Sequence, residues 1–177
     1  AEPLGLARHD NGFIFILWNR GVYSFNSNGA EQWRAPPPEW PDLKDIPMSQ
    51  ESVDICVTKT SIEIWSRAGG CCRLSKEDGS LIGTGSFVLD GSLDKVKAVG
   101  SNRLLVLKNG HIYWYREGKL FCEASSSGPI QGVLYNEELN SWYLAGWREE
   151  LELMEHDFRR FENQEVVVQH VRSPDGL

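Results

Sequence analysis

The chain has 177 residues, with 18 Lys and Arg against 25 Asp and Glu, so its formal net charge is −7. A composition of 41% hydrophobic and 24% charged residues is that of a globular protein and excludes a disordered tail. The acidic balance argues against a protein that tracks nucleic-acid phosphates, and the longest apolar run, Phe13 to Trp18, is too short to span a bilayer. We therefore expect neither a nucleic-acid nor a membrane partner.

The four cysteines (Cys56, Cys71, Cys72 and Cys122) form no CxxC pair and have no histidine at zinc-ligand spacing. Cys56 and Cys122 lie in apolar segments, where a reduced cysteine behaves as a small hydrophobic residue. A chain of this length does not need disulfides to fold, and no secretory signal pattern opens the sequence. These observations predict a cytoplasmic protein with reduced thiols and without a metal or other cofactor.

Apolar residues alternate mostly with period two, and turn dipeptides such as Asn28-Gly29 and Asp78-Gly79 separate the segments, which indicates short antiparallel strands. Each of four units contains two strands joined by a tight turn: Phe13–Trp18 with Gly21–Phe25, Ser61–Trp65 with Gly70–Leu74, Leu104–Leu107 with Gly110–Tyr115, and Trp142–Trp147 with Glu150–Leu153. One strand precedes each pair, at Leu4–Arg8, Ser52–Val57, Val96–Gly100 and Ile130–Tyr135, and one follows it, at Glu31–Trp33, Ser80–Ile82, Leu120–Cys122 and Arg159–Phe161.

The starts of the strands that follow the tight turns (Gly21, Gly70, Gly110 and Glu150) are 49, 40 and 40 residues apart, which is the period of propeller blades. We therefore predict an all-β chain that forms a small β-propeller of four blades, each with four antiparallel strands. The propeller is expected to span residues 1–172, and residues 173–177 to form a flexible tail.

The fourth unit allows an alternative, because it lacks the turn glycine. Leu151, Met154, Phe158 and Phe161 also fall on one face of a helix, so three blades with a C-terminal helix is the second possible arrangement. Val166-Val167-Val168 has the pattern of one further strand, which would close the ring beside the first blade.

The segment Gly21–Trp33 (GVYSFNSNGAEQW) resembles the repeat of β-propellers with pyrroloquinoline-quinone-type or WD-like blades, and Glu77–Gly83 is a weaker copy. The resemblance covers most of the chain as a repeat pattern and implies a propeller. Propellers of this kind often have seven or eight blades, whereas this length allows four, either as a closed ring or as an open fragment completed by a partner. In quinoprotein dehydrogenases with this repeat a vicinal disulfide stacks on the quinone, but Cys71 and Cys72 have no accompanying set of calcium ligands here, so we expect two ordinary strand residues.

No catalytic motif of the GxSxG, HExxH or glycine-rich phosphate-loop type occurs. His9-Asp10 and His156-Asp157 are adjacent pairs at turns, where aspartate serves backbone hydrogen bonds. The sequence therefore favours a protein that is not an enzyme.

Acidic residues are concentrated near the C-terminus. Between Glu137 and Glu165 there are nine acids and three bases, a local sum of −6. A surface of one sign speeds the encounter with an oppositely charged protein, whereas charges on an exposed strand also protect it from aggregation. Under the first interpretation the residues that contact a basic partner are Glu149, Glu150, Glu152, Glu155 and Asp157.

A proline-rich segment, Ala35–Gln50, interrupts the repeat and carries Trp40 between Glu39 and Asp42. A tryptophan in a stiff loop supplies a large apolar anchor for a partner, and we include these three residues in the candidate contact set. The alternative is a loop that folds back so that Trp40 covers the sheet. The tryptophans within strand patterns are expected in the core between blades: Trp18, Trp65, Trp114 and Trp142.

These features together predict a non-enzymatic protein-binding module. A concrete version is a stoichiometric inhibitor or immunity-type protein that neutralises a basic partner such as a toxin. The alternative is a propeller that binds a small ligand or sugar, or a remnant of a quinoprotein-type enzyme.

Overall fold

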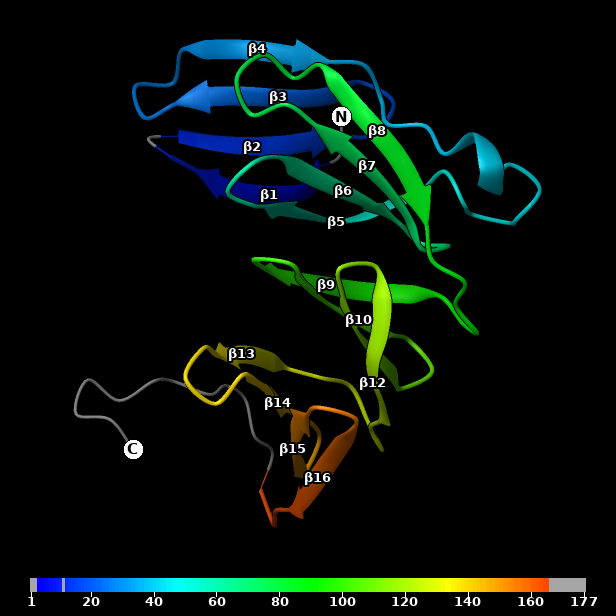
Figure 1. The fold of residues 1–177 in the computed structure, drawn as a ribbon. Helices are drawn as coiled ribbons and strands as arrows, with labels where there is room; N and C mark the ends of the chain where they lie inside the picture. The colour runs from blue at the N-terminus through cyan, green and yellow to red at the C-terminus, as the bar shows by residue number, and fades with distance from the viewer. Residues whose placement is uncertain (1–2, 11, 166–177) are drawn as a thin grey trace. The chain divides into compact units, whose positions relative to one another are not determined.

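The structure is a computed structural model that describes residues 3–10 and 12–165. Within these residues it contains sixteen strands and one short 3-10 helix, η1 (Pro41–Leu43) (Figure 1). The strands form four antiparallel sheets of four strands each, so the predicted all-β class is confirmed. The described residues include no helix that is long and apolar enough to cross a membrane. The predicted strand Val166–Val168 and tail 173–177, with the expected domain end at residue 172, lie outside the described residues.

The chain divides into two compact units, Ala1–Gly100 and Ser101–Leu177. The first unit contains sheet 1, with strands β1 (Pro3–His9), β2 (Gly12–Leu17), β3 (Gly21–Asn26) and β4 (Glu31–Ala35). It also contains sheet 2, with strands β5 (Ser52–Val57), β6 (Ile62–Ser66), β7 (Gly70–Leu74) and β8 (Leu81–Ser86). In both sheets the strands are hydrogen-bonded in chain order, and the first unit ends with β9 (Leu93–Val99).

Sheet 3 has the order β9-β10-β11-β12, with β10 (Asn102–Leu107), β11 (His111–Arg116) and β12 (Lys119–Ser125) in the second unit. Sheet 4 consists of β13 (Gly132–Asn136), β14 (Ser141–Ala145), β15 (Glu149–Met154) and β16 (Asp157–Glu162), again in chain order. The predicted unit starts are confirmed: β3 and β7 begin at the predicted glycines, and β11 and β15 within one residue of the predicted positions.

Short polar side chains close the turns between strands, as the sequence pattern predicted. The Asn26 Oδ1 atom accepts hydrogen bonds from the backbone N–H groups of Asn28 and Ala30, at 3.0 and 2.9 Å. Asp78 and Asn136 hold their turns in the same way. These local bonds fix the strand order within each sheet because they turn the chain back onto its neighbouring strand.

The core of the first unit lies between sheets 1 and 2. One face of sheet 1, with Ile14, Ile16 and Val22, packs with Ile62 and Ile64 of sheet 2 in one buried cluster. Strands β1 and β5 make the contact between the two sheets. The outer strand β4 adds the buried Trp33, whose indole N–H donates to the carbonyl of Lys76 at 3.1 Å.

In the second unit the helical alternative for residues 151–161 is wrong. In β15, the buried Leu151 and Leu153 alternate with the partly exposed Glu150, Glu152 and Met154, which is the period of a strand. Phe161, which a helix would place on the same face as Leu151, is exposed. β15 pairs with both β14 and β16 over its length. Strand pairing therefore overrides the favourable helix propensity of this segment.

Three of the four strand tryptophans are core residues as predicted, namely Trp65, Trp114 and Trp142. The prediction for Trp18 is wrong, because β2 ends at Leu17 and Trp18 lies in the turn that follows, where 47% of it is exposed.

Candidate functional site

A groove of about 560 Å³ lies within the first unit, between the proline-rich segment and sheet 2. Leu81 and Thr84 of β8 form one rim, and the buried Cys72 and Leu74 of β7 form the floor. The opposite wall consists of the prolines that precede η1 and its first residue: Pro36, Pro37, Pro38 and Pro41. These side chains give the groove a mainly apolar lining, which is typical of a binding pocket.

Trp40 holds the proline wall in place. Only 2% of Trp40 is exposed, and its ring lies so close to Gly70 that a Cβ atom there would be 2.4 Å from the ring. Gln50 clamps the backbone of the same residue: its amide oxygen accepts from the Trp40 N–H and its amide nitrogen donates to the Trp40 carbonyl, both at 3.1 Å. The prediction of Trp40 as an exposed anchor is corrected, because the loop folds back and the ring covers the sheet.

Strand β8 presents an outer edge of unusual composition. Each sheet ends in one outer strand, and β4, β12 and β16 all carry charged residues, for example Arg34, Lys119 and Arg159. β8, with the sequence LIGTGS, carries none, and Leu81 and Ile82 are 63% and 52% exposed. Charges normally protect a sheet edge from pairing with another chain, so this edge lacks the usual protection.

Acidic groups predominate at the rim of the groove. Glu39 lines it and is exposed, Asp42 is exposed beside its wall, and Asp78 lines the β8 side. Hydrogen bonds from the backbone N–H and hydroxyl of Ser80 lower the pKa of Asp78, which keeps its carboxylate ionised. The one base in the lining, Arg34, is already paired with Glu31 at 2.8 Å. Of the predicted contact residues, Glu39 therefore lines the groove, Asp42 follows the wall residue Pro41 in the chain without lining the groove, and Trp40 lies beneath the wall.

The groove floor is chemically inert. Burial raises the pKa of the Cys72 thiol from its ordinary value of 9.0 to about 11, so the group is neutral at physiological pH and adds only apolar surface. Cys71 precedes Cys72 in β7 and is opposite Trp65, whereas Cys72 is opposite Ile64, so the two thiols point to opposite faces of sheet 2.

The predicted C-terminal contact residues do not form one surface. Glu149 is 2% exposed, since β15 turns it to the same face as Leu151 and Leu153. Its carboxylate accepts from the Ser127 N–H at 2.6 Å and lies 3.2 Å from the Arg160 guanidinium. It also lines a hollow of about 450 Å³ in which Arg148 and Arg160 balance Glu149 and Glu162.

The remaining predicted acids lie on the other face of sheet 4 or in its β15–β16 turn. Glu150 accepts a hydrogen bond from the Asn163 amide at 2.7 Å, and Glu152 accepts one from the Tyr143 hydroxyl at 2.6 Å and lies 3.8 Å from Arg159. Glu155 and Asp157 are exposed in or next to the turn.

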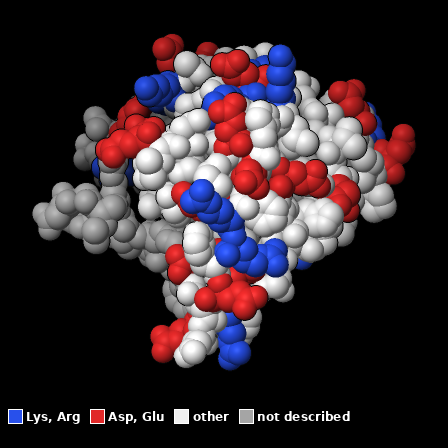
Figure 2. All heavy atoms as spheres, turned by 60° about the horizontal axis from the view of Figure 1, so that its bottom comes forward, with Lys and Arg blue, Asp and Glu red and all other residues white. Residues whose placement is uncertain are grey.

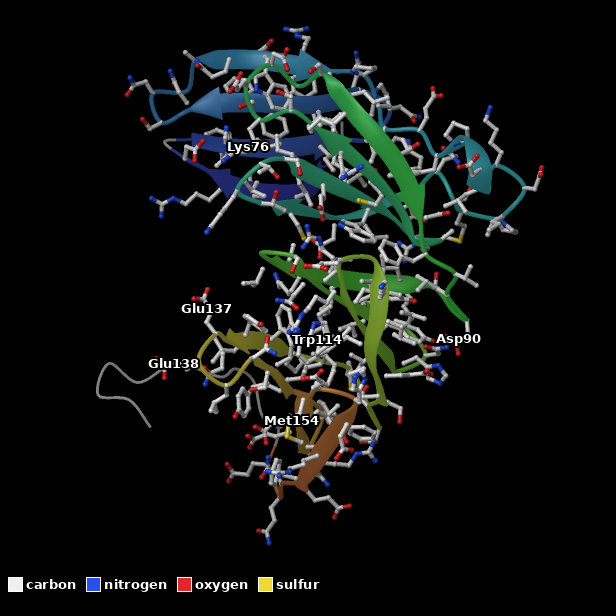
Figure 3. The ribbon with its side chains drawn as sticks, in the orientation of Figure 1. Lys76, Asp90, Trp114, Glu137, Glu138 and Met154 are labelled. Atoms are coloured by element: carbon white, nitrogen blue, oxygen red, sulfur yellow. The ribbon has the colours of Figure 1, made fainter. Side chains whose placement is uncertain are left out.

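Glu137 and Glu138, which belong to the same acidic stretch, lie in the turn between β13 and β14, away from Met154 on β15 (Figure 3). The space-filling view shows acidic and basic side chains interspersed (Figure 2). On the face that Figure 2 shows, the sum of −6 along the sequence therefore does not appear as one acidic surface.

Strand β8 is the part of the site that sequence reasoning missed. The signal was present in Leu81–Ser86, which combines exposed aliphatic residues, two glycines and no charge in the last strand of a unit. Within the described ranges 3–10 and 12–165, no three His, Cys, Asp or Glu side chains are placed to hold a metal ion.

No known protein family matches this chain, and no curated protein matches it. Among solved structures the chain is similar to the computationally designed protein Ika8, with a TM-score of 0.72, 9% identity, and coverage of 98% of this chain and 54% of that one. It is also similar to BamB from Moraxella catarrhalis, with a TM-score of 0.59, 14% identity, and coverage of 87% of this chain and 47% of that one.

Both of these proteins are β-propellers, so sheets 1 to 4 correspond to the four blades of a small propeller, as predicted. The chain spans about half the length of the solved structures it matches. At such low identity the likeness shows the fold alone.

Proposed function

We propose that this chain is a non-enzymatic protein-binding module that takes an extended segment of another protein into the groove beside β8. The observation that carries the proposal is the uncharged outer edge of β8 next to an apolar groove of about 560 Å³. A binding role also accords with the groove floor, where the neutral thiol of Cys72 is a poor nucleophile.

The expected mode of binding is strand addition. β8 is hydrogen-bonded to β7 on one side only, so an incoming strand bonds to the backbone of its free edge. Alternate side chains of that strand then point into the groove, because successive residues of a strand face opposite sides. Apolar residues suit the positions above Cys72 and Leu74, which form the floor.

The rim gives the partner its preferred charge. Glu39 and Asp78 favour a basic residue beside the apolar ones, so we keep the basic partner predicted from the sequence and propose this rim as its contact. The inhibitor and immunity-type versions of this function remain predictions that depend on what the bound segment does in its own protein.

A peptide display library tests the proposal without knowledge of the partner. We expect panning on the immobilised full chain to recover peptides with alternating apolar residues and at least one base. Leu81→Lys places a charge on the edge of β8 and should weaken the binding of these peptides by about tenfold or more, as the loss of a central contact does.

Val88→Lys is the matched control, because Val88 is 96% exposed, lies outside the groove lining and receives the same new charge. Failure to recover any peptide, or recovered peptides that bind the Leu81→Lys and Val88→Lys variants equally well, would overturn the proposal. Thermal-shift screening with sugars and small ligands would then test the alternative, in which a ligand raises the melting temperature.

A further inference from the structure

The turn between β14 and β15 departs from the repeat. In sheets 2 and 3 the residue before the third strand is a glycine with a positive φ, Gly69 at +86° and Gly110 at +89°. Arg148 occupies this position in sheet 4 with a φ of +59°, a backbone conformation that residues other than glycine rarely adopt. Sheet 4 therefore has a large charged residue where glycine suits the backbone.

A shared backbone hydrogen bond shows that the three turn positions are equivalent. The residue after the last strand of each sheet donates its N–H to the carbonyl of the turn residue: Phe87 to Gly69 at 3.0 Å, Ser126 to Gly110 at 2.8 Å, and Asn163 to Arg148 at 2.8 Å. The three sheets thus have the same turn with different side chains. A residue that costs backbone energy at a shared turn points to a role for its side chain.

The side chain of Arg148 lines the hollow of about 450 Å³ beside sheet 4, together with Trp147, which precedes it. The residues that correspond to Trp147 in sheets 2 and 3 are the smaller Ala68 and Asn109. The volume falls in the range of about 300–1,000 Å³ that is typical of small-ligand pockets. Every lining residue belongs to the second unit, so the hollow is a property of that unit alone.

Trp147 supplies an open aromatic surface in this hollow. The loop between β12 and β13 supports the root of its side chain, because a Cβ atom at Gly128 would be 2.7 Å from the Trp147 Cβ. Ser126 holds this loop, since its hydroxyl donates to the Gly128 carbonyl at 2.8 Å. Trp147 is nevertheless 51% exposed, so part of its ring is available to a ligand.

The polar groups of the hollow are balanced in charge. Two arginines and two glutamates line it, and the buried Glu149 lies 3.2 Å from the Arg160 guanidinium. Arg148 and Glu162 are exposed, and in the described part of the chain neither side chain has an ion-pair partner. The hollow therefore offers a ligand one strong donor and one strong acceptor beside an aromatic ring.

We propose that the hollow beside sheet 4 binds a neutral sugar unit, such as one pyranose ring of a glycan. One face of a pyranose ring carries C–H groups and is apolar, so it packs on the exposed ring of Trp147. Each sugar hydroxyl both donates and accepts, so neighbouring hydroxyls bond to the guanidinium of Arg148 and the carboxylate of Glu162. A charged ligand of either sign would meet two like charges in the lining.

An array of neutral and of sulfated or sialylated glycans, probed with the labelled full chain, tests the proposal. We expect binding to neutral glycans, and titration calorimetry with the best of them gives a dissociation constant. Trp147→Ala should raise this constant about tenfold or more, because it removes the stacking surface. Trp18→Ala is the matched control, since Trp18 is 47% exposed in the β2–β3 turn and lies outside the hollow.

Arg148→Gly separates sugar binding from folding. It introduces the glycine of sheets 2 and 3, so the melting temperature should stay the same or rise, whereas the dissociation constant of the glycan should rise about fivefold or more. Leu81→Lys, in the first unit, should leave glycan binding unchanged, so this inference and the proposed function can fail separately.

Three results would overturn the proposal. The first is an absence of binding to every neutral glycan on the array, and the second is binding confined to charged glycans. The third is glycan binding that neither Trp147→Ala nor Arg148→Gly weakens, or that Trp18→Ala weakens as much as Trp147→Ala does.

Discussion

Strands β2 and β6 have similar apolar sequences but lie in different surroundings. In β2, Ile14 and Ile16 are buried, whereas Phe13 in the same strand is 36% exposed, so sheet 1 is covered on one face. In β6 every residue from Ile62 to Ser66 is buried, including the charged Glu63, so sheet 2 is covered on both faces. The exposure of a residue therefore depends more on which elements pack on its sheet than on the hydrophobicity of the strand.

The largest expected effect tests this difference directly. Ile64→Ala in β6 should lower the free energy of unfolding by about 2–5 kcal/mol, because the site is fully enclosed and a cavity remains. Phe13→Ala in β2 removes a larger side chain, yet in dilute protein it should cost less than about 1.5 kcal/mol, since the ring is partly solvated already. Urea unfolding of both variants measures the difference, and equal losses would contradict the contrast between the two sheets.

The acids of sheet 4 extend the comparison to charged residues. Glu149→Ala should lower the free energy of unfolding by about 1–3 kcal/mol, because it leaves the Ser127 N–H without its acceptor and removes the carboxylate that pairs with Arg160, which keeps only its hydrogen bond to the Ser125 carbonyl. Glu155→Ala is the matched control at an exposed position and should change stability by less than about 0.5 kcal/mol. Thermal and urea unfolding should agree, and a similar effect at both positions would show that Glu149 is solvated like Glu155.

The proline wall of the groove should depend on the side-chain amide of Gln50, which holds the Trp40 backbone. Gln50→Ala removes both hydrogen bonds to the Trp40 backbone and should cost about 1–2 kcal/mol of stability while weakening peptide binding in the groove. Gln32→Ala in β4 is the control, since the Gln32 amide makes one long hydrogen bond of 3.5 Å to Ala30. If Gln50→Ala left both stability and binding unchanged, the wall would not depend on this clamp.

The smallest effect at neutral pH is expected from the thiol at the groove floor, which adds a pH dependence to stability. Burial raises the folded-state pKa of Cys72 from 9.0 to about 11, so the folded thiol stays protonated where the unfolded thiol ionises. Its contribution to stability is therefore complete below pH 9 and is lost as pH rises from about 9 through about 11. Unfolding of the wild type and Cys72→Ala between pH 7 and 11 isolates this term. Identical pH profiles for the two proteins would contradict the assignment.

The fold was predictable from the repeat spacing. Turn residues such as Gly21 and Asp78 depend on local backbone geometry, and local geometry can be predicted from a single sequence. The position of Glu149 was also open to prediction, since it has the same strand parity as Leu151 and Leu153. The groove was not, because it forms where residues 36–41 meet β7 and β8, which lie far apart in the sequence. The burial of Trp40 was not predictable for the same reason, because its ring packs against Gly70, which is thirty residues away in the sequence.

We propose that the free edge of β8 receives an extended segment of another protein. Hydrogen–deuterium exchange of the full chain, with and without a peptide selected by panning, tests it most directly. We expect slower exchange at the backbone amides of Leu81–Ser86 on binding, and no change in residues 31–33 of the outer strand β4, which do not line the groove. Protection that appears elsewhere, while β8 exchanges as fast as in the peptide-free chain, would show that β8 does not receive the peptide.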